Sequence, residues 1–224
     1  IMLGGGYGSY DKVMVNGSIS DANVFGSGLS LGLSADISAR TNRFELSLKN
    51  PAINDSKYNG EVEVHNSEAE INRDAYDSTI DTQGFSVGLG REVFRDLYAG
   101  AKYRLDFVSE SYDYEIGKKE AIIEAGKEPY ESQDYINSSI TPYLNFDNTD
   151  DFYMPREGFK LGTSVEYAGV GGDSKYLKSS SYAKYFYSLE DLTELDWVLR
   201  LKTQMKILVD NGQINQGDSL YLGG

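Results

Sequence analysis

Apolar and polar side chains alternate, residue by residue, through most of this chain. In the segment LSLGLSADISA, Leu29, Leu31 and Leu33 alternate with Ser30 and Ser34. A period of two places successive side chains on opposite faces of an extended chain, so each such segment predicts a β-strand with one apolar and one polar face. A twelfth strand is expected to begin at LYLGG, residues 220–224. The eleven complete segments are residues 1–9, 13–20, 29–39, 44–49, 58–65, 85–91, 97–108, 136–146, 159–167, 176–187 and 195–207.

Alternation alone fits both a soluble β-sandwich and a transmembrane barrel, because each has one apolar face. Here the apolar faces carry almost no charge, and a Lys or Arg facing lipid at mid-membrane would cost about 2–4 kcal/mol. The segments also have about the length that a tilted strand needs to cross a bilayer. Connections are tight on one side, as in VFGSG and VFRD, and longer on the other, at residues 66–81 and 109–134. These features favour an all-β fold, a transmembrane antiparallel β-barrel.

One helix is expected, at residues 118–127 in the longest connection. The segment KKEAIIEAGK consists mainly of good helix formers, and Gly126 stands where a helix C-cap belongs. We interpret it as a short helix that covers an outer loop.

Composition narrows the possible partners and chemistry. The chain has 35 acidic and 21 basic residues in 224, a formal charge of −14, so it lacks the basic face that a nucleic-acid backbone requires. It has no cysteine, which excludes a disulfide framework and thiol catalysis. We expect no nucleic-acid partner, no metal and no other cofactor.

The acidic stretch DNTDDFYMPREG, residues 147–158, raises three alternatives: a metal loop, an acidic catalytic centre or a turn. Counted as a calcium loop from Asp147, the sixth position is Phe152 instead of glycine and the twelfth is Gly158 instead of glutamate. Exposed, flexible carboxylates are poor candidates for shifted pKa values. A turn fits better, because Asp and Asn bond their own backbone and Pro155 fixes φ.

The single histidine and a glycine cluster are weak candidates for a metal site and a phosphate-binding loop. His65 is the single histidine, on the polar side of its strand, and without cysteine it cannot build a usual zinc site. We expect it to line the interior or the rim. The glycine cluster GGGYG precedes a strand and not a helix, so it lacks the helix N-terminus of a phosphate-binding loop.

Four stretches of the chain resemble one known protein family. DNTDDFYMPREGFKL resembles the turn between the eighth and ninth strands in the outer-membrane assembly factors, the BamA and Sam50 group, and here it also falls between the eighth and ninth predicted strands. Three more stretches are similar to that family in the same order. These are GGGYGSYDKVMVNGSISDANVFGSGLSLGL at the first hairpin, LSLKNPAI at the end of the fourth strand and SLYLGG before an inward-folded outer loop.

The resemblance implies a non-enzymatic protein of the bacterial outer membrane that folds and inserts other β-barrel proteins. Its first strand would pair poorly with its last, and the seam would open so that a client strand adds to the free edge. The implied partners are outer-membrane lipid, unfolded β-barrel clients and accessory assembly lipoproteins. The implied client-pairing residues are Ile1, Leu3, Gly4, Gly5, Gly6, Tyr7 and Gly8. The implied periplasmic turn motif is Asp147, Asn148, Thr149, Asp150, Tyr153, Pro155 and Gly158.

The resemblance also implies flanking parts. POTRA domains are expected before residue 1, and further strands with a Val-Arg-Gly signature after residue 224. Residues 1–224 would then be the N-terminal two thirds of a sixteen-strand barrel domain. Two other functions stay open: a transporter of the same superfamily that secretes a polypeptide, and a general porin whose constriction loop would be residues 109–134.

Overall fold

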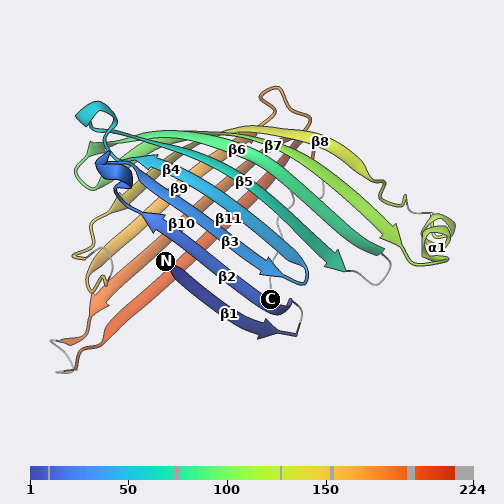
Figure 1. Ribbon diagram of the computed structural model, residues 1–224, viewed down its shortest axis with the longest axis horizontal. Coiled ribbons are helices and arrows are strands. Elements are labelled where there is room, and N and C mark those ends of the chain that lie inside the picture. Colours follow the sequence, from blue (N-terminus) through green and yellow to red (C-terminus); the bar gives the residue numbers. More distant parts are fainter. Residues whose placement is uncertain (10, 73–75, 127, 152–153, 191–194, 215–224) are drawn as a thin grey trace.

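The computed structural model describes residues 1–9, 11–72, 76–126, 128–151, 154–190 and 195–214. Within them the chain forms eleven antiparallel strands in one sheet, in chain order (Figure 1). This confirms the all-β fold and the strands that alternation predicts; the expected twelfth strand lies outside the described residues. The strands are β1 (Met2–Gly8), β2 (Lys12–Asp21), β3 (Ser30–Ser38), β4 (Thr41–Asn50), β5 (Tyr58–Asn72), β6 (Tyr76–Phe94), β7 (Leu97–Tyr114), β8 (Gln133–Asp147), β9 (Gly158–Ala168), β10 (Lys175–Ser188) and β11 (Val198–Gln213).

Strands β5, β6 and β7 are longer than their alternating segments. The predicted connection at residues 66–81 is wrong, because the ends of β5 and β6 pair there, from Asn66 opposite Gln83 to Asn72 opposite Asp77. The face of β5 that is apolar up to Val64 is polar here, at Asn66, Glu68, Glu70 and Asn72, so backbone pairing continues where the apolar row has ended. Similarly, β7 continues to Tyr114 and shortens the next connection to residues 115–132.

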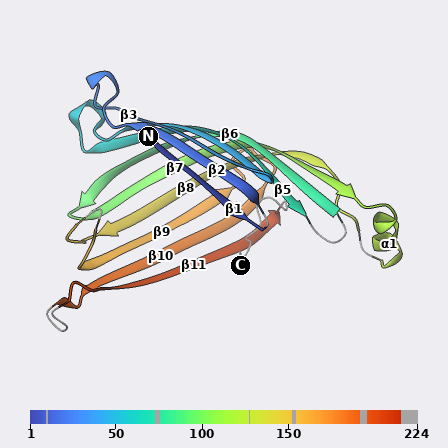
Figure 2. The ribbon, with the colours of Figure 1, turned by 60° about the horizontal axis from the view of Figure 1, so that its bottom comes forward.

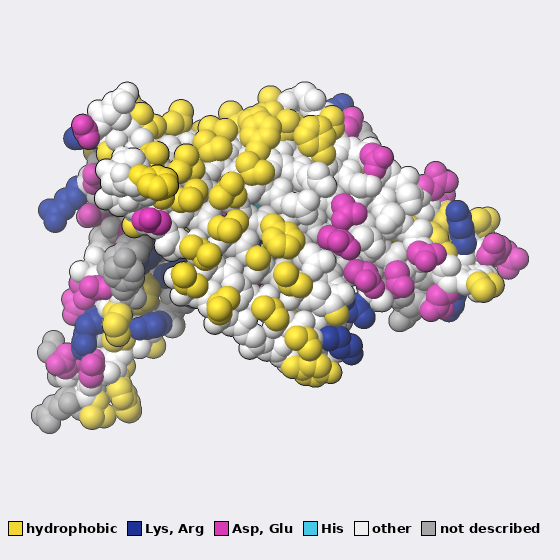
Figure 3. All heavy atoms as spheres, in the orientation of Figure 1, with side chains coloured by type: hydrophobic (Ala, Val, Ile, Leu, Met, Phe, Trp, Pro, Cys, Tyr) yellow, Lys and Arg dark blue, Asp and Glu magenta, His cyan; other side chains and the backbone are white. Residues whose placement is uncertain are grey.

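The apolar side chains form continuous rows on the convex face of the sheet. The sheet curls so that β9–β11 lie behind β2–β5 (Figure 1), and Figure 3 shows the resulting yellow band across the outer face. Towards α1 the band gives way to acidic side chains. One row crosses six strands through Ile19, Leu33, Leu46, Val64, Phe85 and Leu105. Another crosses nine through Leu31, Leu48, Val62, Val87, Tyr103, Ile140, Tyr167, Leu177 and Val209.

On the concave face, tyrosine rings lie across glycines of neighbouring strands. Tyr143 on β8 is opposite Gly100 on β7, which is opposite Gly90 on β6. A Cβ atom at Gly90 would lie 2.6 Å from the Tyr143 hydroxyl, so a larger residue would displace the ring. Tyr182 covers Gly162 in the same way. Each pair packs a large ring into the space that a missing side chain leaves.

The expected helix is α1 (Lys118–Glu124), beyond the ends of β7 and β8 (Figure 1). Its last turn closes where the Gly126 N–H donates to the Ile123 carbonyl at 2.9 Å, with Gly126 at φ +73°. Two short 3-10 turns, η1 (Val24–Gly26) and η2 (Ile53–Asp55), connect β2 to β3 and β4 to β5. No helix in the described ranges is both long enough and apolar enough to cross a membrane.

Candidate functional site

Strand β1 is one edge of the sheet and the shortest of the described strands. It pairs with β2 from Met2 opposite Ser18 to Gly8 opposite Lys12. Its other side has no strand partner within the described residues, and β11 forms the opposite edge. Ile1, Leu3 and Tyr7 are 87%, 83% and 73% exposed. An edge strand presents unpaired N–H and C=O groups to any other strand that approaches.

The glycines of β1 differ in the space around them. A Cβ at Gly5 would lie 3.5 Å from the Met14 carbonyl, and one at Gly6 or Gly8 would lie 3.6 Å from the Met14 Cε. These are ordinary contacts, so crowding does not require glycine at those three positions. At Gly4 an added Cβ would collide with the Asn16 side chain. Three of the four glycines therefore leave room beside β1 that a larger side chain could fill.

The predicted turn motif lies between β8 and β9, and its carboxylates and amide bind the backbone of the turn. The Asp147 Oδ1 accepts hydrogen bonds from the Thr149 N–H and hydroxyl at 3.1 and 2.6 Å. The Asn148 side chain accepts from the Phe159 N–H at 2.8 Å. Tyr153 lies outside the described residues. The polar atoms of this stretch thus close a turn, as the sequence predicts.

Asp150 holds the second half of the same turn. Its Oδ1 accepts from the N–H groups of Arg156 and Glu157 at 2.9 and 3.0 Å, and these bonds lower the pKa of the Asp150 carboxyl. Pro155 is buried, and Gly158 has φ +98°. A Cβ at Gly158 would lie 2.7 Å from the Asn148 carbonyl, so the turn requires glycine there.

Arg156 joins this turn to the next one on the same side of the sheet. Its guanidinium contacts Glu190 Oε2 and Asp196 Oδ1, both at 2.6 Å. Glu190 and Asp196 both lie within the connection from β10 to β11. Arg156 was not among the residues predicted from the sequence, because its pairing depends on the sheet bringing two distant turns together.

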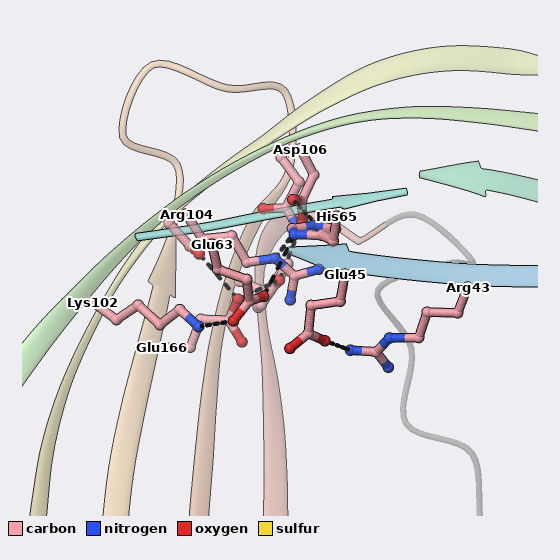
Figure 4. Close-up of polar contacts among 11 residues, drawn as sticks. Arg43, Glu45, Glu63, His65, Lys102, Arg104, Asp106 and Glu166 are labelled. Carbon is pink, nitrogen blue, oxygen red and sulfur yellow. Dashed lines mark hydrogen bonds and ion pairs between the residues drawn. The ribbon is translucent and has the colours of Figure 1, made fainter. Parts of the chain in front are cut away.

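The interior carries a network of ionic side chains from β5, β7 and β9 (Figure 4). His65 Nε2 lies 2.9 Å from Asp106 Oδ1, and Arg104 Nε lies 2.6 Å from Asp106 Oδ2. Glu63 pairs with Lys102 at 3.2 Å. Both His65 and Asp106 are buried. His65 therefore lines the interior, as expected, but as one member of a network.

Sequence patterns do not predict this network. Alternation places each member on the polar face, but which of them meet depends on the register of three strands. Gly84 on β6 is the register partner of both His65 and Asp106, and its missing side chain lets them meet. In the part of the chain that the structure describes, no group of three or more acidic or histidine side chains is placed to hold a metal ion.

Three comparisons agree with this geometry. The family model described as the Omp85 superfamily domain matches residues 23–224. The chain is 29% identical over 231 residues to the outer membrane protein assembly factor BamA of Nitratidesulfovibrio vulgaris, covering 100% of this chain and 27% of that protein. It therefore spans about a quarter of that relative's length. The crystal structure of BamA from Haemophilus ducreyi lacking POTRA domains 1–3 superposes with a TM-score of 0.72, at 20% identity, over 94% of this chain and 41% of that one.

The structural match shows a shared fold, and the family match covers most of the chain. Together with the open antiparallel sheet and its apolar convex face, they decide between the barrel and the soluble sandwich. The chain belongs to the Omp85 superfamily and forms part of an integral β-barrel of the bacterial outer membrane.

Proposed function

We propose that this chain belongs to a protein that folds and inserts β-barrel proteins into the outer membrane, with β1 as the strand to which a client adds. The residues that would pair with the client are Ile1, Leu3, Gly4, Gly5, Gly6, Tyr7 and Gly8. Residues 1–224 would form the N-terminal two thirds of the barrel domain, and the turn at residues 147–158 would face the periplasm. Partners would be outer-membrane lipid, unfolded clients and accessory lipoproteins.

The observation that carries the proposal is the short, glycine-rich pairing of β1 at the edge of the sheet. This strand is the shortest of those described, it pairs with β2 at seven positions, and four of its seven residues are glycine. Glycine weakens a strand because it contributes no side-chain packing. A client strand can replace weak resident pairing through backbone hydrogen bonds, which do not depend on the client's sequence.

The long outer connection favours assembly over the porin alternative. A porin constriction needs a charged loop folded into the interior, and residues 109–134 were the candidate. Residues 109–114 instead continue β7, and α1 lies beyond the strand ends and away from the concave face (Figures 1 and 2). The secretion alternative shares the same barrel, and no feature of the described residues favours it.

The test replaces Gly5 and Gly8 with valine in the complete protein and measures insertion of an unfolded barrel client into proteoliposomes. Both positions have room for a Cβ, so the variant should fold, while valine strengthens the resident strand. We expect client insertion to slow at least about fivefold. The matched control is Gly88→Val in β6, where an added Cβ meets nothing closer than 3.9 Å. Unchanged insertion by the Gly5→Val/Gly8→Val variant would contradict the role of β1.

A further inference from the structure

Arg91 is a cation on the lipid-facing side of the sheet. It lies on β6, opposite Tyr58 on β5 and Ala99 on β7, and shares the convex face with the apolar rows. Both neighbouring strands of β6 are described, so the edges of the sheet do not determine what surrounds it. Within strands β2–β9 as described, Arg91 is the one Lys or Arg on the convex face. The other cations of these strands lie on the concave face: Lys12, Arg43, Lys49, Lys102, Arg104 and Lys160.

The Arg91 guanidinium lies against Tyr58. Its Nη1 donates to the Tyr58 hydroxyl at 3.0 Å, its Cζ lies 5.2 Å from the centroid of the Tyr58 ring, and its Nε donates to the Glu92 carbonyl at 3.5 Å. No carboxylate of the described residues forms an ion pair with it. A guanidinium carries five N–H groups, and a tyrosine hydroxyl that accepts one bond still has its own proton to donate. Most of the donors of this pair therefore remain available to an anion.

The pair lies near the end of the sheet that carries the turn between β8 and β9. The Asp147 N–H donates to the Asp96 carbonyl at 2.9 Å, so the turn after β6 and the turn after β8 share that end. Arg91 is three residues before Phe94, the last residue of β6, which is about 10 Å along the strand. In a strand tilted by about 40° this is about 8 Å along the membrane normal, close to the thickness of one headgroup layer. Leu89, two residues further towards the membrane centre, is 56% exposed on the same face.

The other end of the same strands carries the opposite charge. Glu68 on β5 and Asp81 on β6 are register partners on the convex face, and Asp134 on β8 lies in the same row. No Lys or Arg in the described ranges forms an ion pair with these three carboxylates. Figure 3 shows the same change, from the yellow band to acidic side chains towards α1. One membrane boundary of β5 and β6 therefore repels phosphate groups and the other attracts them.

From this arrangement we infer that Arg91 and Tyr58 bind the phosphate group of a phospholipid in the leaflet beside the turn between β8 and β9. A guanidinium binds phosphate through two parallel N–H···O bonds, and the Tyr58 O–H supplies a further donor. A cation that faces lipid costs far less at the headgroup level than at mid-membrane, and a bound phosphate lowers that cost further. The headgroup holds this side of the barrel at a fixed depth in the membrane.

The ligand is a lipid and not free phosphate, because the pair lies on the convex face. The acyl chains of a bound phospholipid extend from Arg91 along the apolar row that begins at Leu89, which free phosphate cannot use. Only the name of the leaflet rests on the proposed function, which places the turn between β8 and β9 in the periplasm and so makes this the periplasmic leaflet.

Native mass spectrometry of the complete protein tests the site, with dioleoylphosphatidylglycerol as the probe. Dioleoylglycerol, which has the same chains and no phosphate, is the comparison lipid. We expect Arg91→Gln to weaken binding of the first phosphatidylglycerol about tenfold, because a charge-assisted bidentate contact is lost. Wild-type protein that binds the two lipids equally, or an Arg91→Gln variant that binds phosphatidylglycerol as the wild type does, would overturn the inference.

Further variants separate the contact from charge alone. Arg91→Lys keeps the charge and loses the planar fork, and Tyr58→Phe keeps the ring and loses the hydroxyl, so each should weaken binding about threefold. The matched control Arg43→Gln removes one charge from the concave face and should bind phosphatidylglycerol as the wild type does. An equal loss in Arg43→Gln would show that net charge controls binding, and would overturn the site. Retained heat-modifiable mobility on gels confirms that each variant is folded.

Two more outcomes fix the source of the phosphate and separate this inference from the proposed function. Millimolar inorganic phosphate should leave the lipid bound, and displacement would assign the pair to free phosphate and overturn the lipid site. If the wild type binds phosphatidylglycerol through Arg91 but inserts no client, the proposed function fails and the lipid site stands. If the wild type inserts clients and Arg91→Gln binds the lipid unchanged, the lipid site is wrong and the proposed function stands.

Discussion

His65 on β5 and Asp106 on β7 form a buried contact across the intervening strand, with 2.9 Å between Nε2 and Oδ1. Two strands of a sheet with a third between them are about 9.6 Å apart, so the contact spans one full strand. It forms because Gly84 on β6 has no side chain at the crossing point.

We therefore predict that Gly84→Ala destabilises the barrel by about 1–3 kcal/mol, the range for overpacking a well-packed site. The new Cβ would lie 2.5 Å from the Leu105 carbonyl and 3.0 Å from His65 Nε2, and would collide with Asp106. Urea unfolding of the complete protein in lipid vesicles, followed by tryptophan fluorescence, measures the change. Gly88→Ala, on the same strand and face, should be nearly neutral, because an added Cβ there meets nothing closer than 3.9 Å. Equal effects of the two changes would contradict this explanation.

The turn between β8 and β9 should loosen in acid because of Asp150. The backbone N–H groups of Arg156 and Glu157 stabilise the carboxylate and lower the pKa of Asp150. Its pKa is thus lower in the folded turn than the ordinary value of about 3.9. The stabilisation is fully present above the ordinary pKa and is lost as the pH falls through the folded pKa.

Hydrogen exchange at the Arg156 and Glu157 amides, corrected for intrinsic rates, measures this effect. Protection of these two amides should be constant near neutral pH and should decrease once the pH is lower than about 4. In Asp150→Asn the oxygen acceptor remains but the charge is absent, so protection should be lower at pH 7 and should not change further in acid. A variant that keeps the wild-type pH profile would show that another group controls the turn.

The two faces of the sheet should react differently with a lipid-soluble carbene. Val64 and Leu201 are 53% and 55% exposed on the convex face, while their neighbours His65 and Lys202 lie on the concave face. In native outer membranes we expect strong labelling of Val64 and Leu201 and little labelling of His65 and Lys202. Mass spectrometry of the labelled peptides reads this out. Similar labelling of all four would mean that the convex face does not face lipid.

The sequence was informative wherever one face of a strand is apolar. Alternation predicted the strands and their order, and the residues of DNTDDFYMPREG predicted the turn, because Asp and Asn bond the backbone locally. The ends of β5 and β6 were not predicted because the face of β5 that is apolar up to Val64 becomes polar at Asn66, Glu68, Glu70 and Asn72. The contacts of His65 and Arg156 were not predicted for a different reason. Each joins residues more than thirty positions apart, and only the register and the curvature of the sheet bring them together.

Disulfide mapping of β1 against a client strand tests the central claim most directly. The chain has no cysteine, so single cysteines at Leu3, Gly5 and Tyr7 can be paired with single cysteines along the terminal strand of a client stalled during insertion. Client addition to β1 predicts disulfides in one antiparallel register that moves by two client residues for each two residues of β1, and none from a cysteine at Asn16 on β2. Disulfides with no fixed register, or as many from Asn16 as from β1, would contradict the proposal that the β1 edge receives the client.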